Sequence, residues 1–570
     1  MKRNLIITGA LGLVLSGMMA SCASDYLDTP PFASVTSDQV GANTDNLSKA
    51  INGIALLMNF PKNGEQNGYP CGNVGEGYIM TFFGDAMGQD YYSYHFGMFE
   101  SGSMIRMERF ANASYYTSTD AWGYYYAMVR MANSILEKVD GAVETVEGQR
   151  NEIKAQALTY RAHAYVRLLQ LYGPRWSDSN NGERKTIVLR LKETTDAMPL
   201  STMNEVLNQI YADLDEAIAL FETTGTLQPT DLITPDVRVT AGIYARAALL
   251  KEDWAKAETM AQKARTGTNI MTADEYCGGF MLATSDYLWT NSIADENILS
   301  NASWGSRNAA NGEFQQRNQI GNGNINRDLY KQMDKNDIRR TLYVMPEVVG
   351  NPVSQYYKAN EEKIKYVDPE TMAIWFQGGR LATRALRYVT EHTPTCSNGE
   401  HVAAAYQDFT GKGALPFILF GSQLKFFCYG DSKQACQYPY MRGTEMLLTQ
   451  AEAAYMQGKT AEAQQLISQL MSKRIEGFTT CTKTGQELLD EIRLQRRLEL
   501  WGEGSTFFDL KRWGMNNTRR AWVEDDVNSG NIPSSYAMDV APNQANHWVL
   551  MIPRVETDYN EAIDMSELAW

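Results

Sequence analysis

The stretch YARAALLKEDWAKAETMAQKA at residues 244–264 decides the fold of this chain, because its pattern returns as AEAAYMQGKTAEAQQLISQL at residues 451–470. Both stretches carry alanines at matching positions, and a short polar break divides each into two apolar halves. The matching residues are Ala245, Ala247, Ala248, Ala255 and Ala257, and in the second copy Ala451, Ala453, Ala454, Ala461 and Ala463. Small residues at these spacings let two antiparallel helices approach closely. The repeat therefore predicts stacked helical hairpins.

Helical periodicity also runs through the N-terminal half of the chain. Apolar residues recur three and four positions apart over residues 122–139 and again over 158–169, which predicts two amphipathic helices. The second of these is expected to end at Gly173, which a proline follows. Thr202 and Glu205 have the spacing of a capping box, so a third helix is expected to begin there. These signals favour an all-α body of tetratricopeptide-type hairpins.

Two other regions have a different composition. Residues 271–436 are rich in Asn, Gly, Gln and aromatic side chains, which predicts loops and short strands carried by a rigid scaffold. Residues 38–119 show no sustained helical period and are expected to be irregular as well. Either the insertion interrupts the helical stack, or the hairpins on its two sides come together in space. Three units are expected. The first, residues 38–270, carries the N-terminal helices; the second, residues 271–436, is the loop-rich insertion, which is expected to bind the ligand; and the third, residues 437–570, carries the second hairpin and the C-terminal motif.

The N-terminus has the features of an export signal. Lys2 and Arg3 precede an apolar stretch at residues 5–15 that is too short to span a bilayer. Met19-Ala20-Ser21-Cys22 then resembles the lipobox at which bacterial lipoproteins are cleaved and acylated. The alternative is an ordinary secretory signal with a chance cysteine. The expected segments are a signal peptide at 1–21 and a lipid-linked tether rich in Pro, Thr and Ser at 22–37.

Composition excludes some partners. The formal net charge of −15 argues against nucleic acid and against docking on anionic lipid head groups, both of which require a basic face. Contact with a membrane is therefore expected through the lipid on Cys22 alone. The remaining cysteines form no C-x-x-C pair, and we expect several buried thiols with one possible disulfide between the nearest pair, Cys428 and Cys436. The histidines are scattered singly and predict no metal site; bound calcium is possible but not indicated.

The densest motif of the chain lies near its C-terminus. Arg496, Glu499 and Glu503 share one face of an expected helix that ends at Gly504, and this spacing is suited to mutual ion pairs. Two carboxylates and an arginine also suit catalysis, but a structural polar cluster at a helix end is the commoner outcome. The motif continues as Asp509-Leu510-x-Arg512-Trp513-Gly514.

This motif, together with the lipobox, resembles the SusD/RagB family of nutrient-binding outer-membrane lipoproteins. The resemblance covers both ends and the middle of the chain. The further matching segments are Tyr26-Leu27-Asp28, Ala162 to Gly173, Asp253-Trp254, Met441-Arg442, Glu445 to Ala453, and Ile552-Pro553 with Glu556 and Asn560. One departure is Thr506, which stands where the family usually has Arg and weakens one expected ion pair.

The resemblance implies an all-α, right-handed superhelical scaffold of about four tetratricopeptide-like hairpins with an irregular region packed against it. It also implies a receptor on the outer face of the outer membrane that captures an oligosaccharide or another nutrient. The implied partner is a TonB-dependent transporter of the SusC type, over which the lipoprotein sits as a lid. The resemblance further implies a binding protein without catalytic activity or a cofactor.

A receptor for neutral sugars needs flat aromatic platforms and side chains that form paired hydrogen bonds with hydroxyls. The insertion and the early irregular stretch supply both kinds of residue. The candidates are Asp90, Tyr91, Tyr92, Tyr94, Tyr287, Trp289, Trp304, Gln316, Arg317, Asn318 and Trp375. For each aromatic residue the competing interpretation is packing in the core or between domains.

Two other classes of function are weighed against the receptor. An exported helical glycan hydrolase would need two carboxylates beside the scissile bond, for which Asp85, Asp90, Asp286 and Glu296 are available. No spacing singles out a pair, and the common hydrolase motifs are absent from the sequence. A repeat adaptor that binds only proteins would favour an apolar groove over a surface of aromatic and amide groups. The family resemblance favours the receptor.

Overall fold

The structure is a computed structural model of the 570-residue chain. It describes residues 40–59, 64–66, 69–71, 75–92, 106–108, 112–224, 231–291, 303–309, 312, 323–343, 364–368, 373–376, 423, 425–428, 435–521, 530, 532 and 536–568. The expected signal peptide and tether lie outside these residues.

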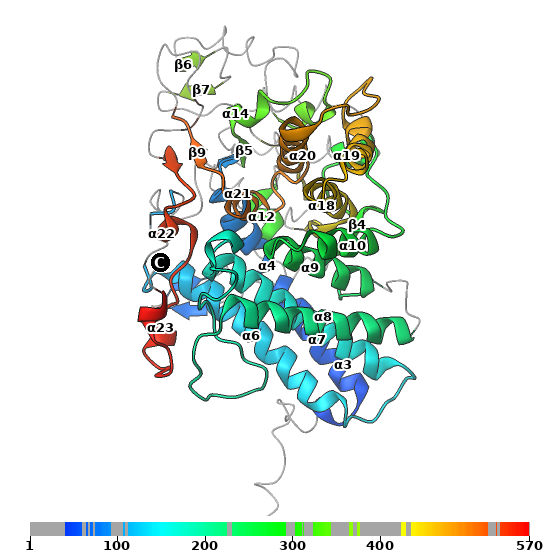
Figure 1. The fold of residues 1–570 in the computed structure, drawn as a ribbon, viewed down its shortest axis with the longest axis vertical. Coiled ribbons are helices and arrows are strands. Elements are labelled where there is room, and N and C mark those ends of the chain that lie inside the picture. The colour runs from blue at the N-terminus through cyan, green and yellow to red at the C-terminus, as the bar shows by residue number, and fades with distance from the viewer. Residues whose placement is uncertain are drawn as a thin grey trace, which may run out of the picture.

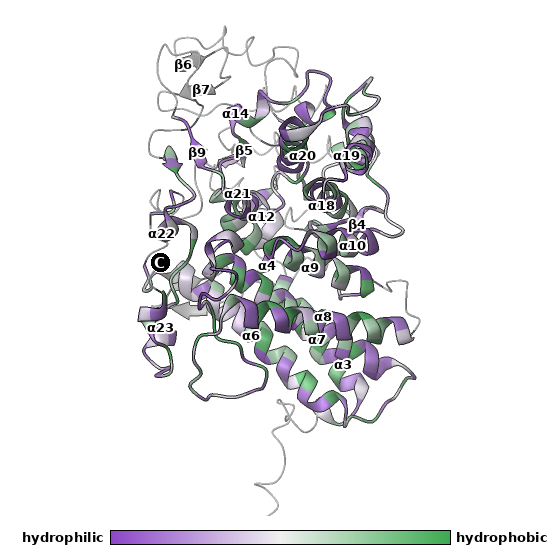
Figure 2. Cartoon of the chain, viewed as in Figure 1, coloured by the Kyte–Doolittle hydropathy of each residue, from purple (hydrophilic) through white to green (hydrophobic). Residues whose placement is uncertain are grey.

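The body is a stack of α-helices in which each helix packs on the next (Figure 1). In order of contact these are α6 (Tyr116–Val139), α7 (Gln149–Tyr172), α8 (Met203–Thr224), α9 (Val237–Leu250), α10 (Trp254–Ala264), α18 (Gly443–Met456), α19 (Thr460–Arg474) and α20 (Gly485–Glu499). Hydrophobic residues on the facing sides of α6 to α10 form the main core, those of α18, α19 and α20 form a second cluster, and hydrophilic residues gather on the outward faces (Figure 2). The prediction of an all-α scaffold of tetratricopeptide-like hairpins is confirmed.

The two copies of the alanine repeat lie side by side. Helix α10, from the first copy, contacts α18, from the second, although the long insertion separates them in sequence. Ala257 and Ala453 are both fully buried in one small cluster with Leu249, so no large side chain holds the two helices apart. Arg265 Nε also donates to Gln450 Oε1 at 2.9 Å across this contact. Of the two arrangements left open by the sequence, the hairpins come together in space.

Helix ends follow the local chemistry that the sequence indicates. Thr202 Oγ1 accepts the Glu205 backbone N–H at 3.1 Å, and the Glu205 carboxylate accepts the Thr202 N–H at 2.7 Å, which forms the predicted capping box. Helix α7 ends before Gly173, as expected. Asp253 caps α10 in the same way, by accepting the Lys256 N–H at 3.2 Å.

The prediction that residues 38–119 are irregular is wrong in part. Helix α3 (Thr44–Asn59) lies in this stretch and buries Leu47, Ile51, Ile54 and Met58 against α6 and α7. These four residues have helical spacing, so the period was present in the sequence. Farther along, α4 (Glu76–Ile79) continues into a π-helical segment, η1 (Met80–Ala86), which is buried throughout.

The strands are short and pair only two by two within the described residues. The antiparallel pairs are β1 (Gly64–Gln66) with β2 (Tyr69–Cys71), β3 (Tyr91–Tyr92) with β5 (Asn324–Ile325), β4 (Tyr287–Thr290) with β8 (Pro439–Arg442), β6 (Ile364–Asp368) with β7 (Ala373–Phe376), and β9 (Asn517–Arg519) with β10 (Met538–Val540). The β4–β8 pair is buried and lies against α9, so the first part of the insertion belongs to the core.

Short helices complete the described chain. They are α11 (Ala273–Cys277), α12 (Trp304–Asn308), α14 (Arg327–Tyr330), α21 (Thr506–Trp513), α22 (Ala545–Trp548) and α23 (Arg554–Thr557), with 3-10 turns at Trp176–Asp178, Ile338–Leu342 and Met565–Leu568. The C-terminal segment with α22 and α23 runs down one side of the stack (Figure 1). Of the helices in the described ranges, none combines the length and apolar character that crossing a bilayer requires.

Four of the cysteines are buried thiols. Cys277, Cys428, Cys436 and Cys481 are thiols, so the possible disulfide between Cys428 and Cys436 is not formed in this structure. Burial raises the pKa of the Cys428 thiol, and a hydrogen bond with Cys436 raises it further. Both residues therefore act as small apolar side chains in the core.

Candidate functional site

The structure brings together the two regions in which the sequence places ligand contacts. Strand β3 of the early stretch pairs with β5 of the insertion, with Tyr91 opposite Ile325 and Tyr92 opposite Asn324. The Asn326 side chain strengthens this junction by donating to Gln89 O at 2.7 Å. We call the junction of β3 and β5 the β3–β5 rim. Two segments that are far apart in sequence therefore meet at this junction.

The C-terminal motif holds the chain that leads into this rim. Arg497 binds the Asp90 carboxylate through two hydrogen bonds of 2.5 and 2.8 Å, and the Trp501 indole N–H donates to Asp90 O at 2.9 Å. One turn earlier, Asp85 Oδ2 accepts the Gly504 N–H at 2.8 Å. Burial raises the pKa of the Asp85 carboxyl well above its usual range. These contacts fix the position of the rim from its buried side.

Glycine is required where the chain at Gly504 crosses the π-helical segment η1. Gly504 has φ +80°, and a Cβ atom there would lie 2.5 Å from Met80 Cβ. A Cβ atom on Gly84 would lie 2.2 Å from Gly504 O. Thr506, the departure from the family pattern, is buried and lies against Gly88. The close backbone crossing explains why the motif has a glycine at position 504.

Four predicted ligand residues are placed in the interior, which corrects those predictions. Asp90 is fully buried and is neutralised by Arg497. Tyr91 is 6% exposed and stacks on Trp501 with the ring centroids 5.2 Å apart. Trp289 is completely buried in the main core, and Tyr287, on the same strand, is 2% exposed. A platform for a sugar has to be exposed, so these side chains act in packing.

Trp304 is the described candidate that is only partly buried. Its indole N–H donates to Thr81 Oγ1 at 2.8 Å, and its ring stacks on Tyr438 with the centroids 4.4 Å apart. These contacts hold the ring in one orientation, which lowers the entropy cost of binding on its remaining surface. Trp304 thus stays a candidate.

The other candidates are not tested. Tyr94, Gln316, Arg317 and Asn318 lie outside the described residues, as does Glu296. Tyr92 and Trp375 are described only through the backbone of strands β3 and β7, and Cys22 falls in the expected tether.

The C-terminal motif forms a buried polar cluster, as the structural interpretation expected, but its ion pairs differ from the expected ones. Arg496, Glu499 and Glu503 do not pair with one another. Arg496 binds Asp509 at 2.6 Å, whereas Glu499 binds Arg474 at 2.9 Å. Helix α20 also ends at Glu499, five residues before the expected end at Gly504. The motif therefore joins α20 to other elements of the stack.

Glu499 and Glu503 are surrounded by buried cations. Glu499 also lies 3.4 Å from Arg442 and 3.5 Å from Arg339, and Glu503 binds both Arg442 at 2.7 Å and Lys425 at 2.6 Å. Burial alone would raise the pKa of the Glu499 carboxyl, but the three arginines outweigh it and hold the pKa well below its usual range. Burial lowers the pKa of Lys425 to about 8. This network of buried ion pairs therefore has a structural role.

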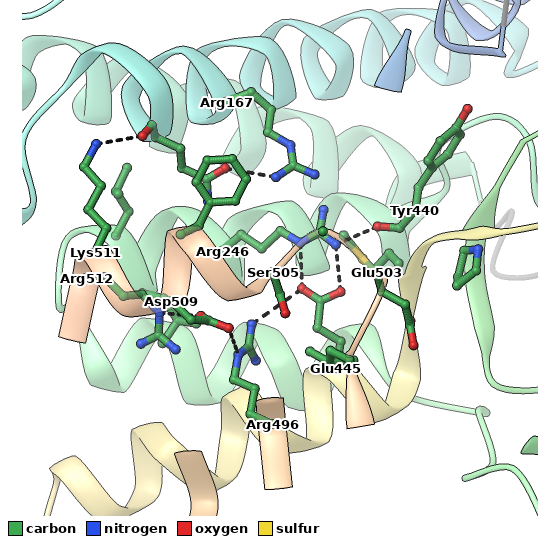
Figure 3. A pocket seen from close by; sticks show the side chains of 18 of the residues that line it. Arg167, Arg246, Tyr440, Glu445, Arg496, Glu503, Ser505, Asp509, Lys511 and Arg512 are labelled. Carbon is green, nitrogen blue, oxygen red and sulfur yellow. Dashed lines mark hydrogen bonds and ion pairs between the residues drawn. The ribbon is translucent and has the colours of Figure 1, made fainter. Parts of the chain in front are cut away.

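Next to this network lies the cavity of Figure 3, with a volume of about 50 Å³. Arg246 points into it from α9 and binds Glu445 of α18 through two hydrogen bonds of 2.7 and 2.8 Å. Arg496 approaches Glu445 from α20 at 4.0 Å, and Ser505 also lines the cavity. The cavity has room for a few water molecules and not for a sugar.

A second buried cluster ties α4 to α7. The Glu76 carboxylate binds Arg167 Nε at 2.9 Å and Tyr125 Oη at 3.0 Å, and His163 Nε2 lies 3.2 Å away. Burial would raise the pKa of Glu76, but His163 and Arg167 outweigh it and lower the pKa to about 2. The single histidine on this helix therefore has the structural role expected from its apolar neighbours.

The sequence did not predict the buried cations that bind Glu499 and Glu503. Lys425 lies in the loop-rich insertion and Arg474 at the end of α19, and no local spacing connects either one with the C-terminal motif. For Arg442, the sequence indicates only that it belongs to a segment resembling the SusD/RagB family, and it predicts no ion pair. Buried ion pairs between distant segments leave no periodic signal, so these residues could not be assigned from spacing alone.

The motif and the surrounding fold can be compared with known proteins. A family model described as "SusD family" matches residues 286–564, and a model described as "Starch-binding associating with outer membrane" matches residues 79–231. No curated protein sequence matches the chain.

Solved structures share the fold over nearly the whole chain. A SusD-like carbohydrate binding protein from Bacteroides vulgatus has a TM-score of 0.67 at 20% identity, covering 92% of this chain and 97% of that one. A SusD superfamily protein from Bacteroides thetaiotaomicron has a TM-score of 0.63 at 18% identity, covering 92% and 99%. Surface glycan-binding protein A from the same species has a TM-score of 0.61 at 14% identity, covering 92% and 98%.

The two family models match different parts of the chain, one ending before α9 and the other beginning next to β4, and the similar structures have the same helical scaffold. The chain belongs to the SusD family.

Proposed function

We propose that this protein is a lipid-anchored glycan receptor on the outer face of the outer membrane. It captures oligosaccharides and delivers them to a TonB-dependent transporter of the SusC type. The observation that carries the proposal is the family match, since one of the two models is described as starch-binding associating with the outer membrane. A similar structure is a surface glycan-binding protein. The lipid anchor rests on Cys22 and its lipobox.

The β3–β5 rim is the proposed glycan site. The two segments that carry the sequence candidates meet there, and the buried contacts of Asp90 and Tyr91 hold the rim rigid. The proposed ligand residues are Tyr92 of β3 and, from the sequence, Tyr94, Trp304, Gln316, Arg317 and Asn318, with Trp375 as a further candidate. A preorganised rim loses little entropy on binding, which suits a receptor for flexible oligosaccharides.

The alternative is a glycan hydrolase, and the described carboxylates do not favour it. Asp90 is bound by Arg497, and Asp286 is buried against Arg442 at 2.6 Å. Asp85 is buried with one oxygen on Gly504 N. Each of these carboxylates has a structural partner in place of an approach to a scissile bond.

The test is binding of oligosaccharides without their cleavage. The full-length protein, purified in detergent, is titrated with a panel of starch, xylan, mannan and pectin oligosaccharides, and the sugars are analysed by mass afterwards. We expect one class to bind and to be recovered at its original length. Recovery of shorter sugars would favour the hydrolase, and no binding of any class would contradict the receptor.

A further inference from the structure

Asp85 precedes strand β3 of the rim and is completely buried where the π-helical segment η1 crosses the chain at Gly504. Oδ2 of Asp85 accepts the Gly504 N–H at 2.8 Å, but Oδ1 has no hydrogen-bond partner among the residues that the structure describes. Asp286 is buried to the same extent but differs, because Arg442 binds it at 2.6 Å. A buried charge without a paired cation is costly, so an ionised Asp85 does not suit this position.

Lys425, a cation whose charge acts on Asp85, donates its hydrogen bonds to other groups. Its ammonium has three N–H donors, and these go to Glu499 O at 2.9 Å, Trp501 O at 2.8 Å and Glu503 Oε1 at 2.6 Å. Burial raises the pKa of the Asp85 carboxyl well above its usual range, and neither its backbone hydrogen bond nor the Lys425 charge reverses this.

Charged and titratable groups from several segments surround Asp85. Within the described residues they are Asp90, Tyr91, Tyr343, Lys425, Glu503 and Arg519. The carboxylates of Asp90 and Glu503 oppose ionisation of Asp85, and burial raises the pKa of both tyrosines. Arg519 donates to the backbone at the end of η1, to Ala86 O and, at 2.6 Å, to Gly88 O. The surroundings therefore favour the neutral acid over the carboxylate.

The chain at Gly504 connects Asp85 with the rim. The two backbones touch at their crossing, where glycines leave no space for a Cβ atom, so water reaches Asp85 only if the chains separate. Trp501, in the turn that leads to Gly504, donates to Asp90 O at 2.9 Å and stacks on Tyr91 of β3. A movement of Gly504 away from η1 therefore strains the contacts that hold β3.

We propose that Asp85 is a pH switch for the β3–β5 rim: the neutral acid keeps the rim closed, and release of its proton to water accompanies opening. A carboxyl whose pKa is raised on folding stabilises the closed state fully below its ordinary pKa of 3.8. Its contribution is lost as the pH rises through the pKa of the closed state. The inference rests on the proposed function and adds a regulation of the same site, which opens more readily as the pH rises.

The test measures local opening of the rim in the full-length protein without any ligand. Amide hydrogen exchange is followed by mass spectrometry from pH 5 to pH 7 in a peptide that covers η1 and β3. After correction for the intrinsic exchange rate, protection should fall about tenfold per pH unit, because each opening releases one proton. This range lies below the pKa of Lys425, about 8, so its charge stays constant. A peptide from α8 is the internal control and should not show this slope.

Two variants assign the slope to Asp85. Asp85→Asn keeps the shape of the neutral acid without its proton, so protection should no longer depend on pH, and the urea midpoint at pH 7 should rise. Asp196→Asn makes the same change at an exposed aspartate and should keep the slope.

A flat profile in the unsubstituted protein, or a slope that persists in Asp85→Asn, would overturn the switch and leave the proposed receptor intact. The receptor is tested separately, because this measurement needs no sugar. Failure of every oligosaccharide to bind would overturn the receptor, whereas the slope and its loss in Asp85→Asn would still establish the switch.

Discussion

At the scale of single residues, this protein places many charges in its interior and pairs them across distant segments. Glu499 is the centre of the largest group, with Arg474, Arg442 and Arg339 around one carboxylate. Removing one partner from such a group leaves the others charged and buried, which is strongly destabilising. These residues therefore constrain how α19, α20 and the insertion fit together.

The lowered pKa values of Glu76 and Glu499 predict acid sensitivity. A carboxyl whose pKa falls on folding, as that of Glu76 does from 4.5 to about 2, stabilises the fold above pH 4.5. Its contribution is lost as the pH falls from 4.5 toward 2. We expect the urea midpoint to drop steeply between pH 5 and pH 3 and Glu76→Gln to make that drop smaller, with each such carboxyl contributing roughly 3 kcal/mol.

The control for this prediction is Glu561→Gln, which removes an exposed carboxyl. It should leave both the midpoint at pH 6 and its pH dependence as they are in the unsubstituted protein. A Glu76→Gln protein whose midpoint falls between pH 5 and pH 3 as steeply as that of the unsubstituted protein would refute the role assigned to this cluster.

Substitution of Trp304 tests whether this side chain contacts the ligand or only packs against its neighbours. Trp304→Ala should weaken oligosaccharide binding by ~1–3 kcal/mol if its remaining surface is part of the site. Trp254→Ala is the matched control, because Trp254 is also partly buried but packs on the alanine cluster of α10. Affinities from calorimetry decide the matter: a similar loss for both variants would show that Trp304 acts through stability alone.

At the scale of secondary-structure elements, the close contact of α10 with α18 holds the two halves of the stack together. It depends on side chains that are small enough to bring the two backbones near each other, such as Ala257 and Ala453. The matching positions of the two repeats made this contact predictable from the sequence, although its place in space was not.

A larger side chain at this contact should act as a wedge. We expect Ala257→Leu to destabilise the protein by ~1–3 kcal/mol, because added methylene groups have no space in a well-packed contact. Ala255→Leu, two residues earlier on the same helix, places the same side chain on an exposed position and should have little effect. Thermal unfolding of the two variants gives the comparison. Equal unfolding temperatures would mean that the contact is not tight.

Other elements show what sequence reasoning misses. Helix α3 has its apolar residues at helical spacing, but the Gly- and Asn-rich chain around it concealed the period. Trp289 was expected at the surface because its neighbours are polar, yet β4 pairs with β8 beneath α9. That pairing joins residues about 150 positions apart and leaves no local signal. Local patterns predicted most helices, whereas the candidate site depended on contacts between distant segments.

At the scale of the whole molecule, the helical stack supports the proposed glycan site at the β3–β5 rim. The C-terminal motif holds the β3–β5 rim, because the Trp501 indole N–H donates to Asp90 O next to β3. The rim is built from chain segments that are distant in sequence. The proposed lipid on Cys22 would keep this support at the cell surface.

The most direct measurement is retention of a fluorescent oligosaccharide, of the class found in the binding panel, by intact bacteria that lack their own copy of the gene. Cells that produce the unsubstituted chain should incorporate labelled palmitate into it and retain the sugar after washing. Cells that produce Cys22→Ala should do neither, although the purified variant still binds the sugar. Equal retention by the two kinds of cell, or retention by neither, would contradict the account of a lipid-anchored surface receptor.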